Sequence, residues 1–124
     1  MNDKLNKFSA CILIIGNEIL SGRTQENNVS YISKWLNTIG VKLEEARIIP
    51  DIKEIIIKNV NESRKKFDYV FTTGGIGPTH DDITAESISE AFNLNYETNE
   101  EAFNLLKKYY KPGEFTEGRQ RMTK

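Results

Sequence analysis

The chain has 124 residues, of which 38% are hydrophobic and 28% are charged, with eight glycines and three prolines. This length fits one domain, and this composition excludes collagen-like, low-complexity and wholly disordered chains. Seventeen Lys and Arg residues against eighteen Asp and Glu residues give a net charge of -1, so no surface for nonspecific nucleic-acid binding is expected. A small-molecule ligand is the better expectation.

The single cysteine, Cys11, lies inside an apolar run. It cannot form an internal disulfide, and its surroundings predict a buried thiol in a reducing compartment. The apolar run covers residues 10–15 and ends at Gly16, which is too short for a signal-peptide core or a membrane span. We therefore expect a cytoplasmic protein without membrane contact.

The first half of the chain predicts two strands with a helix between them. Residues 10–15 (ACILII) form a continuous apolar run, which is typical of a central parallel strand covered on both faces. Residues 28–39 have apolar side chains at helical spacing and are followed by Gly40, which predicts an amphipathic helix. Residues 41–44 alternate as a half-buried edge strand does, and the chain leaves that strand at residues 48–50.

A second helix and a second buried strand follow. Asp51 is expected to cap a helix whose apolar positions lie within 52–60, with the basic residues 64–66 solvated at its far end. Residues 69–72 (YVFT) are β-rich and predict a short buried strand that ends in a cluster of turn-forming residues.

The last third of the chain predicts more helix. A helical stripe covers residues 83–92, and Asp81, Asp82 or Thr84 occupies the expected capping position. Residues 95–98 are a possible edge strand. Thr98 and Glu101 have the spacing of a capping box for a helix over residues 102–110, and we expect little order beyond residues 111–113.

Strands that alternate with helices predict an α/β fold with a mostly parallel sheet and right-handed crossovers. Only two strands look central, whereas a doubly wound domain has about five or six. The sequence therefore predicts one domain over residues 1–124, with an ordered core at about 8–111 and a sheet cut short at its C-terminal side.

The most specific motif is the loop over residues 72–84, which reads TTGGIGPTHDDIT. Ligands of open α/β sheets bind outside the carboxyl ends of the strands, and the three glycines of this loop let the backbone approach an anion closely. The loop contains neither the G-x-G-x-x-G dinucleotide pattern nor a P-loop. It predicts a phosphate site of another kind.

Asp81 and Asp82 in this loop would repel a phosphate unless a divalent cation, first of all magnesium, bridges them. Alternatively, one aspartate caps the following helix while the other is solvated or binds the metal. His80 is the only histidine, and a lone loop histidine is more often solvent-facing than catalytic.

The loop GNEILSG follows the first strand and would bring Glu18 and Ser21 to the same mouth as the glycine loop. The simpler alternative is a surface charge followed by a turn. Trp35 and the pair Tyr109–Tyr110 are expected in the core or in an interface rather than in a ring-stacking site.

These motifs together resemble the molybdopterin-binding (MoCF, MoaB/Mog-like) domain, and most of all its CinA-like branch. The resemblance rests on G-x-E-I-L-x-G at residues 16–22, Asn28 at a helix start, Pro50–Asp51, and residues 73–84. The branch includes the N-terminal domain of CinA and the molybdopterin-binding-like domain of eukaryotic FAD synthases, whose GGIGPTHDD pattern this sequence matches. The likeness covers about residues 10–124.

The resemblance implies a three-layer α/β/α domain that binds a phosphate-bearing pterin or nucleotide and forms a homo-oligomer, a dimer or a trimer. In the molybdenum-cofactor members, the positions matching Asp51 and Asp82 serve metal-dependent adenylyl transfer onto molybdopterin. CinA-like members instead cleave a pyrophosphate such as ADP-ribose or FAD, also with a metal. The loop has GPTHDD rather than the SPRD common in MoaB and Mog, which weighs against molybdenum chemistry. The family domain continues past Met122 into further strands.

Two functional hypotheses follow from the sequence. The first is metal-dependent hydrolysis of a nucleotide pyrophosphate, with Asp51 and Asp82 as catalytic residues and Mg, Mn or Co held by Asp81 and Asp82. The second is a non-catalytic module that binds molybdopterin or a related phosphorylated ligand, linked to molybdenum cofactor biosynthesis. In both, the expected ligand-binding residues are Gly16, Glu18, Ser21, Asn28, Thr73, Gly74, Gly75, Gly77, Pro78, Thr79 and Thr84.

Overall fold

Three parallel strands form the sheet, in the order β2-β1-β3. The computed structural model describes residues 7–124. Its strands are β1 (Phe8–Ile15), β2 (Val41–Ile49) and β3 (Tyr69–Thr73). Its helices are α1 (Asn17–Leu20), α2 (Asn28–Thr38), α3 (Lys53–Lys66), α4 (Thr84–Ala91), α5 (Glu100–Tyr109) and α6 (Glu117–Arg121). The predicted α/β class is confirmed.

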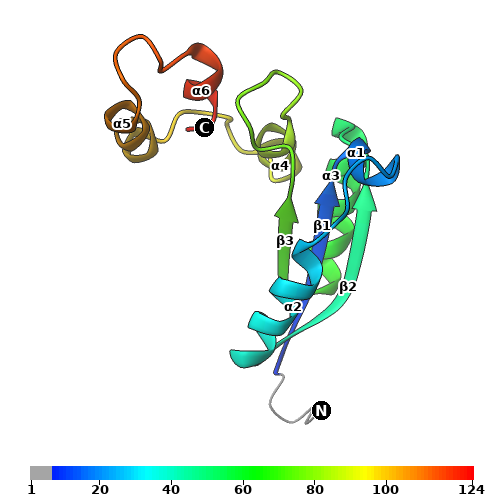
Figure 1. Cartoon of the computed structure of the whole chain (residues 1–124). Coiled ribbons are helices and arrows are strands. Elements are labelled where there is room, and N and C mark those ends of the chain that lie inside the picture. The colour runs from blue at the N-terminus through cyan, green and yellow to red at the C-terminus, as the bar shows by residue number, and fades with distance from the viewer. Residues whose placement is uncertain (1–6) are drawn as a thin grey trace.

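Helices cover both faces of the sheet, which gives three layers (Figure 1). On one face, α2 packs Leu36 against Ala10 and Val41. On the other face, α3 and α4 cover a larger core that includes Leu13 and Ile56. The central strand β1 is therefore buried on both sides, and none of its residues 10–15 is more than 4% exposed. This burial explains why that segment is apolar without alternation.

A one-residue bulge in β2 decides which of its side chains face α3. Ala10 pairs with Leu43 but Cys11 pairs with Glu45, so Glu44 is the extra residue. Before the bulge, Leu43 packs in the α2 core. After the bulge, Glu45 and Arg47 contact side chains of α3. A bulge moves the following side chains to the opposite face of a strand.

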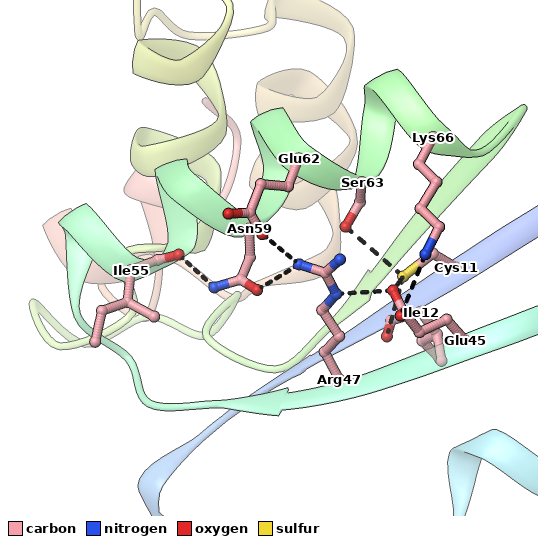
Figure 2. A network of polar contacts seen from close by, with 9 residues as sticks. All are labelled: Cys11, Ile12, Glu45, Arg47, Ile55, Asn59, Glu62, Ser63 and Lys66. Carbon is pink, nitrogen blue, oxygen red and sulfur yellow. Dashed lines mark hydrogen bonds and ion pairs between the residues drawn. The ribbon is translucent and has the colours of Figure 1, made fainter.

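The α3 side of β2 carries a polar network centred on Arg47 (Figure 2). The Arg47 guanidinium donates to Glu45, Asn59 and Glu62 at 2.8–2.9 Å. Its hydrogen bond lowers the pKa of Glu45 and keeps that carboxylate ionised. The buried Cys11 thiol lies at the edge of the network, 3.7 Å from Ser63 Oγ, and burial raises its pKa. The network gives a partner to each charged side chain of β2 that faces α3, so neither Glu45 nor Arg47 is left unpaired between the strand and the helix.

Two expectations about the sheet need correction. We predicted β3 as a buried central strand, but it lies at the edge opposite β2, and Tyr69 is 47% exposed. Trp35 is not in the core, since 55% of its surface is exposed beside a groove that also exposes Phe8, Ile39 and Tyr69. Its alternative role in an interface stays a prediction.

No helix within residues 7–124 is long and apolar enough to cross a membrane.

Residues 94–124 form a C-terminal arm that extends beyond α4, away from the sheet (Figure 1). The predicted strand at 95–98 is wrong, because residues 94–99 have no regular structure. The predicted Thr98 cap is also wrong: Asn99 caps α5, its side chain accepting a hydrogen bond from the Ala102 N–H at 2.9 Å.

Order continues past residue 113, contrary to expectation, because the arm closes on itself. Phe103, Tyr110 and Phe115 pack as an aromatic cluster, and the Arg119 guanidinium lies 4.4 Å from the Tyr110 ring centre. Tyr109, by contrast, is 79% exposed. The Asn99 N–H also donates to the Thr123 carbonyl at 2.7 Å, which ties the start of α5 to the residues after α6.

Candidate functional site at the carboxyl ends of the strands

A cavity of about 280 Å³ opens where β1 and β3 end, and we call it the α1 cavity. Parallel strands present their carboxyl ends at one edge, so the loops after β1 and β3 meet there. The cavity is lined by Ile14, Ile15, Glu18, Ile19, Thr24, Gln25, Glu26, Asn27, Asn28, Thr73 and Gly74. Of the predicted ligand-binding residues, Glu18, Asn28, Thr73 and Gly74 therefore share one cavity.

Glu18 reaches this cavity from α1, a short helix that the sequence analysis did not identify. Its carboxylate folds back over Gly16, where an added Cβ would lie 2.5 Å from Glu18 Oε1. Gly16 thus makes room for the carboxylate rather than lining the cavity. Ser21 does not line it either, since its hydroxyl donates to the Glu18 carbonyl and accepts from Arg23 Nε.

Glu26 is a residue of the α1 cavity that the sequence analysis missed. Its carboxylate accepts hydrogen bonds from the backbone N–H groups of Asn28 and Val29, the first residues of α2. A carboxylate at a helix N-terminus satisfies free N–H groups and favours the helix dipole. The sequence feature that could have identified Glu26 is an acidic side chain two residues before the predicted start of the helix.

The glycine loop joins β3 to α4 and requires glycine at two positions. Gly74 and Gly75 have φ values of 90° and 65°. A Cβ on Gly74 would lie 2.0 Å from the Ile15 carbonyl oxygen, and one on Gly75 would lie 2.2 Å from Thr84 Oγ1. The Thr84 hydroxyl donates to the Gly74 carbonyl at 2.9 Å, and Thr84 is 1% exposed. Thr84 therefore holds the glycine loop in place through a hydrogen bond from a buried side chain.

Asp82 is turned toward its own loop. Its Oδ2 accepts hydrogen bonds from the Thr79 N–H at 2.9 Å and from the Thr79 hydroxyl at 2.8 Å. Partial burial would raise the pKa of Asp82, but these bonds and one from the Gly77 backbone outweigh it, so the pKa is lowered. Asp82 is therefore ionised at neutral pH.

The predicted helix cap at residues 81–84 is wrong. Ile83 occupies the N-cap position of α4, and no side chain caps it. Asp81 instead points to solvent and lies 3.3 Å from His80 Nε2, with 78% and 88% of the two side chains exposed. The surface position expected for His80 is confirmed.

A second cavity of about 200 Å³ lies on the other side of the glycine loop, and we call it the α6 cavity. It is lined by Gly75, Ile76, Gly77, Thr79, Asp82, Ala85, Tyr96, Arg121, Met122 and Lys124. Arg121 of α6 donates from Nη2 to the Pro78 carbonyl at 3.1 Å, which joins the arm to the loop. The glycine loop is thus a wall shared by two cavities.

Asp51 lines neither of these cavities. It follows β2, one strand away from Glu18 and two strands away from Asp82 in the sheet order. It does not cap α3 as predicted, because Ile52 is the N-cap residue and no side chain caps that helix. Within residues 7–124, no three His, Cys, Asp or Glu side chains gather as a metal-ligand cluster.

Comparison with known proteins agrees with this architecture. The family model described as a probable molybdopterin binding domain matches residues 11–121. A CinA-like protein from Chloroherpeton thalassium is 43% identical over 96 residues, and one from Thermosipho melanesiensis is 44% identical over 98 residues. These matches cover 77% and 78% of this chain but 23% and 24% of those proteins. A protein from Archaeoglobus fulgidus is 42% identical over 100 residues, covering 81% of this chain and 44% of its own length. The chain thus spans less than half the length of these curated relatives.

Solved structures show the same fold. The crystal structure of the protein CinA from Thermoplasma acidophilum matches with a TM-score of 0.87 at 30% identity, covering 95% of this chain and 70% of that one. MoaB from Thermus thermophilus matches with a TM-score of 0.63 at 21% identity, covering 86% of this chain and 67% of that one. The three-layer fold expected from the resemblance is confirmed. The chain belongs to the family of probable molybdopterin-binding domains, in its CinA-like branch.

Proposed function

We propose that this domain binds a pyrophosphate-linked nucleotide of the ADP-ribose or FAD type at the glycine loop and hydrolyses it with a divalent cation. One observation carries the proposal. The N–H groups of Thr79 and Asp82 donate hydrogen bonds to acceptors within the loop. No described residue accepts a hydrogen bond from the N–H group of Gly75 or Ile76. Free backbone N–H groups between a strand and a helix are a common means of binding phosphate.

The acidic residues of the loop fit a cation that binds together with its substrate. Mg²⁺ is usually held by one or two carboxylates, waters and substrate phosphates rather than by an all-protein cage. Asp82 is ionised, and its hydrogen bonds to Thr79 engage only Oδ2. Asp81 is exposed beside it. When bound, a divalent cation would neutralise phosphate charge and supply an activated water.

The chain's own residues account for binding and orientation. The N–H groups of Gly75 and Ile76 would stabilise negative charge on a phosphate oxygen, as donors that are already positioned. Thr79 fixes the orientation and the ionised state of Asp82. Asp51, at the end of β2, would approach the ligand from the other side of β1.

A second function is a binding module that does not turn its ligand over. The observation that favours it is that Asp51, one of the two proposed catalytic residues, lines neither of the cavities at the glycine loop. The family description names molybdopterin, and the similar structures include a molybdopterin biosynthesis enzyme, so a phosphorylated pterin is the ligand to test.

Turnover distinguishes the two functions. We would incubate the protein with ADP-ribose or FAD plus Mg²⁺, Mn²⁺ or Co²⁺ and measure the release of AMP. We expect the wild type to release AMP and both Asp82→Ala and Asp51→Ala to abolish this release. The melting temperature of each variant should change little, since both residues lie in loops. Glu44→Ala, an exposed charge on β2, is the matched control. Binding without AMP release would favour the module, and full activity in both aspartate variants would contradict the assigned roles.

We also propose that the domain self-associates, because both outer edges of its sheet have no partner strand among the described residues. The apolar groove of about 400 Å³ beside Trp35 adds exposed surface that a second copy would cover. Sedimentation velocity over a concentration series should show dimers, trimers or larger species. A clean monomer at all concentrations would contradict this proposal.

A further inference from the structure

The two cavities that share the glycine loop carry opposite charges. Glu18 and Glu26 line the α1 cavity together with amide and hydroxyl side chains, and no Lys or Arg of residues 7–124 lines it. Arg121 and Lys124 line the α6 cavity, where Asp82 is the one acidic side chain among the described residues. A phosphate approaching the loop would therefore be repelled on one side and attracted on the other.

We propose that the α6 cavity is the subsite for the phosphate-bearing, anionic half of the ligand, and that the α1 cavity takes a neutral group rich in hydrogen-bond donors. This inference rests on the proposed function, because it takes the glycine loop as the ligand-binding element. It adds the direction in which the ligand lies across the loop and assigns Arg121 as its anion-binding residue.

Arg121 is held in place beside the loop. Its Nη2 donates to the Pro78 carbonyl at 3.1 Å. On the same helix, Gly118 packs so closely that an added Cβ would lie 2.4 Å from that same carbonyl oxygen. A guanidinium has five N–H donors in a planar fork, so one bond to Pro78 leaves others for a phosphate. The contact holds the Arg121 side chain in the cavity that Gly75 and Ile76 also line, and no acceptor within residues 7–124 binds the N–H groups of these two residues.

The other charges of the α6 cavity agree with an anionic guest. The negative charge of Asp82 is partly compensated by two hydrogen bonds from Thr79. Lys124 places its ammonium 5.0 Å from the centre of the Tyr96 ring, so a cation and an aromatic face lie together at the cavity wall. An aromatic ring next to two basic groups suits a phosphate linked to a flat heterocycle.

The α1 cavity has the opposite chemistry. Glu26 is already occupied by the N–H groups of Asn28 and Val29. The Glu18 carboxylate folds over Gly16 and remains an acceptor at the cavity wall. Carboxylate, amide and hydroxyl oxygens without a basic partner suit N–H and O–H donors of a ribose or a heterocycle, and they disfavour a free phosphate.

Calorimetric titration with sodium pyrophosphate tests the assignment. We expect Arg121→Gln to weaken binding by about tenfold, the effect of losing a charged hydrogen bond. Lys124→Gln should weaken it by about threefold, since a less constrained charge contributes less. Glu18→Gln should tighten pyrophosphate binding, because it removes a negative charge from the other side of the loop. Lys108→Gln, which removes an exposed charge from α5, is the matched control and should stay within twofold of the wild type.

The outcomes separate the inference from the proposed function. If the wild type does not bind pyrophosphate, the glycine loop is not a phosphate site and the proposed function fails. If the wild type binds and Glu18→Gln weakens binding while Arg121→Gln does not, only the direction of the ligand is overturned. Pyrophosphate should also shift the amide NMR signals of Gly77, Ala85 and Tyr96 more than those of Thr24 and Asn28.

Arg121→Lys distinguishes charge from support of α6. This variant keeps the positive charge but loses the planar fork that reaches Pro78, and we expect it to bind pyrophosphate within about threefold of the wild type. If it instead binds as weakly as Arg121→Gln while Lys124→Gln binds normally, the role of Arg121 is to hold α6 and the subsite assignment is wrong.

Discussion

The sheet body, residues 7–93, and the C-terminal arm, residues 94–124, are stabilised in different ways. All thirteen buried hydrophobic residues of the described chain lie in the body, on the two faces of the sheet. In the arm, α5 has no buried residue, and only Thr123 is buried. The arm depends on aromatic pairs such as Phe103–Phe115, helix caps, and the contacts of Arg121 and Gly118 with Pro78.

This difference shows how a small domain can separate stability from recognition. Burial of apolar surface supplies most folding free energy, so the body should unfold as one unit. The arm makes fewer apolar contacts and should open at lower free energy. The glycine loop joins the two regions, so part of its ligand-binding wall belongs to the less stable region.

The largest expected effect is a cavity in the body. Leu13 is fully buried in β1 and packs in the core under α3 and α4. Leu13→Ala should lower the free energy of unfolding by roughly 3–5 kcal/mol, because the well-packed site cannot collapse around the missing atoms. Phe103→Ala in the arm should cost clearly less, although it removes more atoms, because Phe103 is only partly buried.

Chemical denaturation followed by far-UV circular dichroism measures both variants. Hydrogen exchange gives an independent view of the same comparison, with α5 amides expected to exchange before those of α3. Equal losses for Leu13→Ala and Phe103→Ala would show that the arm belongs to the cooperative core, and the distinction between the two regions would fail.

The next largest effect compares two glycines with similar backbone angles. Gly74 in the loop and Gly113 in the arm have φ values of 90° and 85°. Gly74→Ala would also place a Cβ 2.0 Å from the Ile15 carbonyl oxygen, whereas nothing lies within 4 Å of a Cβ on Gly113. We expect Gly113→Ala to cost about 1–2 kcal/mol from the backbone alone and Gly74→Ala to cost more. Similar thermal shifts for the two variants would contradict the close approach.

The sequence predicted those parts of the fold that repeat a local pattern over many residues. The apolar run of β1 and the helical spacing of α2 and α3 both reflect burial against the sheet, so they could be read without the structure. The failures lie where a tertiary contact decides. Residues 95–98 look like a strand but pair with none of the three strands, and Tyr69 lies at an edge because no strand among the described residues lies beyond β3.

The sequence predicted where the site residues lie better than it predicted what each of them does. The rule that parallel strands end at one edge brought Glu18 and Gly74 to the same cavity. The internal hydrogen bonds of the loop could not be predicted, because Asp82 had several possible partners and bonds Thr79 instead of capping α4. Arg121 was missed because its place beside Pro78 depends on the path of the whole arm.

A smaller effect is expected when the side chains that cap a helix in the body and a helix in the arm are removed. Asn99→Ala removes the side chain that accepts from the Ala102 N–H at the start of α5, a change worth about 1 kcal/mol. We expect faster hydrogen exchange in α5 with little change in the melting temperature. Glu26→Ala removes the carboxylate at the start of α2 and should lower the melting temperature, since α2 covers one face of the sheet. A fall in melting temperature with Asn99→Ala alone would reverse the comparison.

The smallest effect concerns the loop between the two regions and depends on pH. Hydrogen bonds from Thr79 and Gly77 outweigh the effect of burial and lower the pKa of Asp82 below its unfolded value. A lowered carboxyl pKa stabilises the fold above the unfolded pKa, and that contribution is lost as the pH falls through the lower, folded pKa. Below about pH 4, where carboxyl groups begin to protonate, the Thr79 amide should therefore shift toward its disordered NMR position before the amides of β1 change. Asp82→Asn, which cannot ionise, should remove this step and leave the acid unfolding of the body as it is. A Thr79 amide that titrates equally in both proteins would show that another group controls the loop.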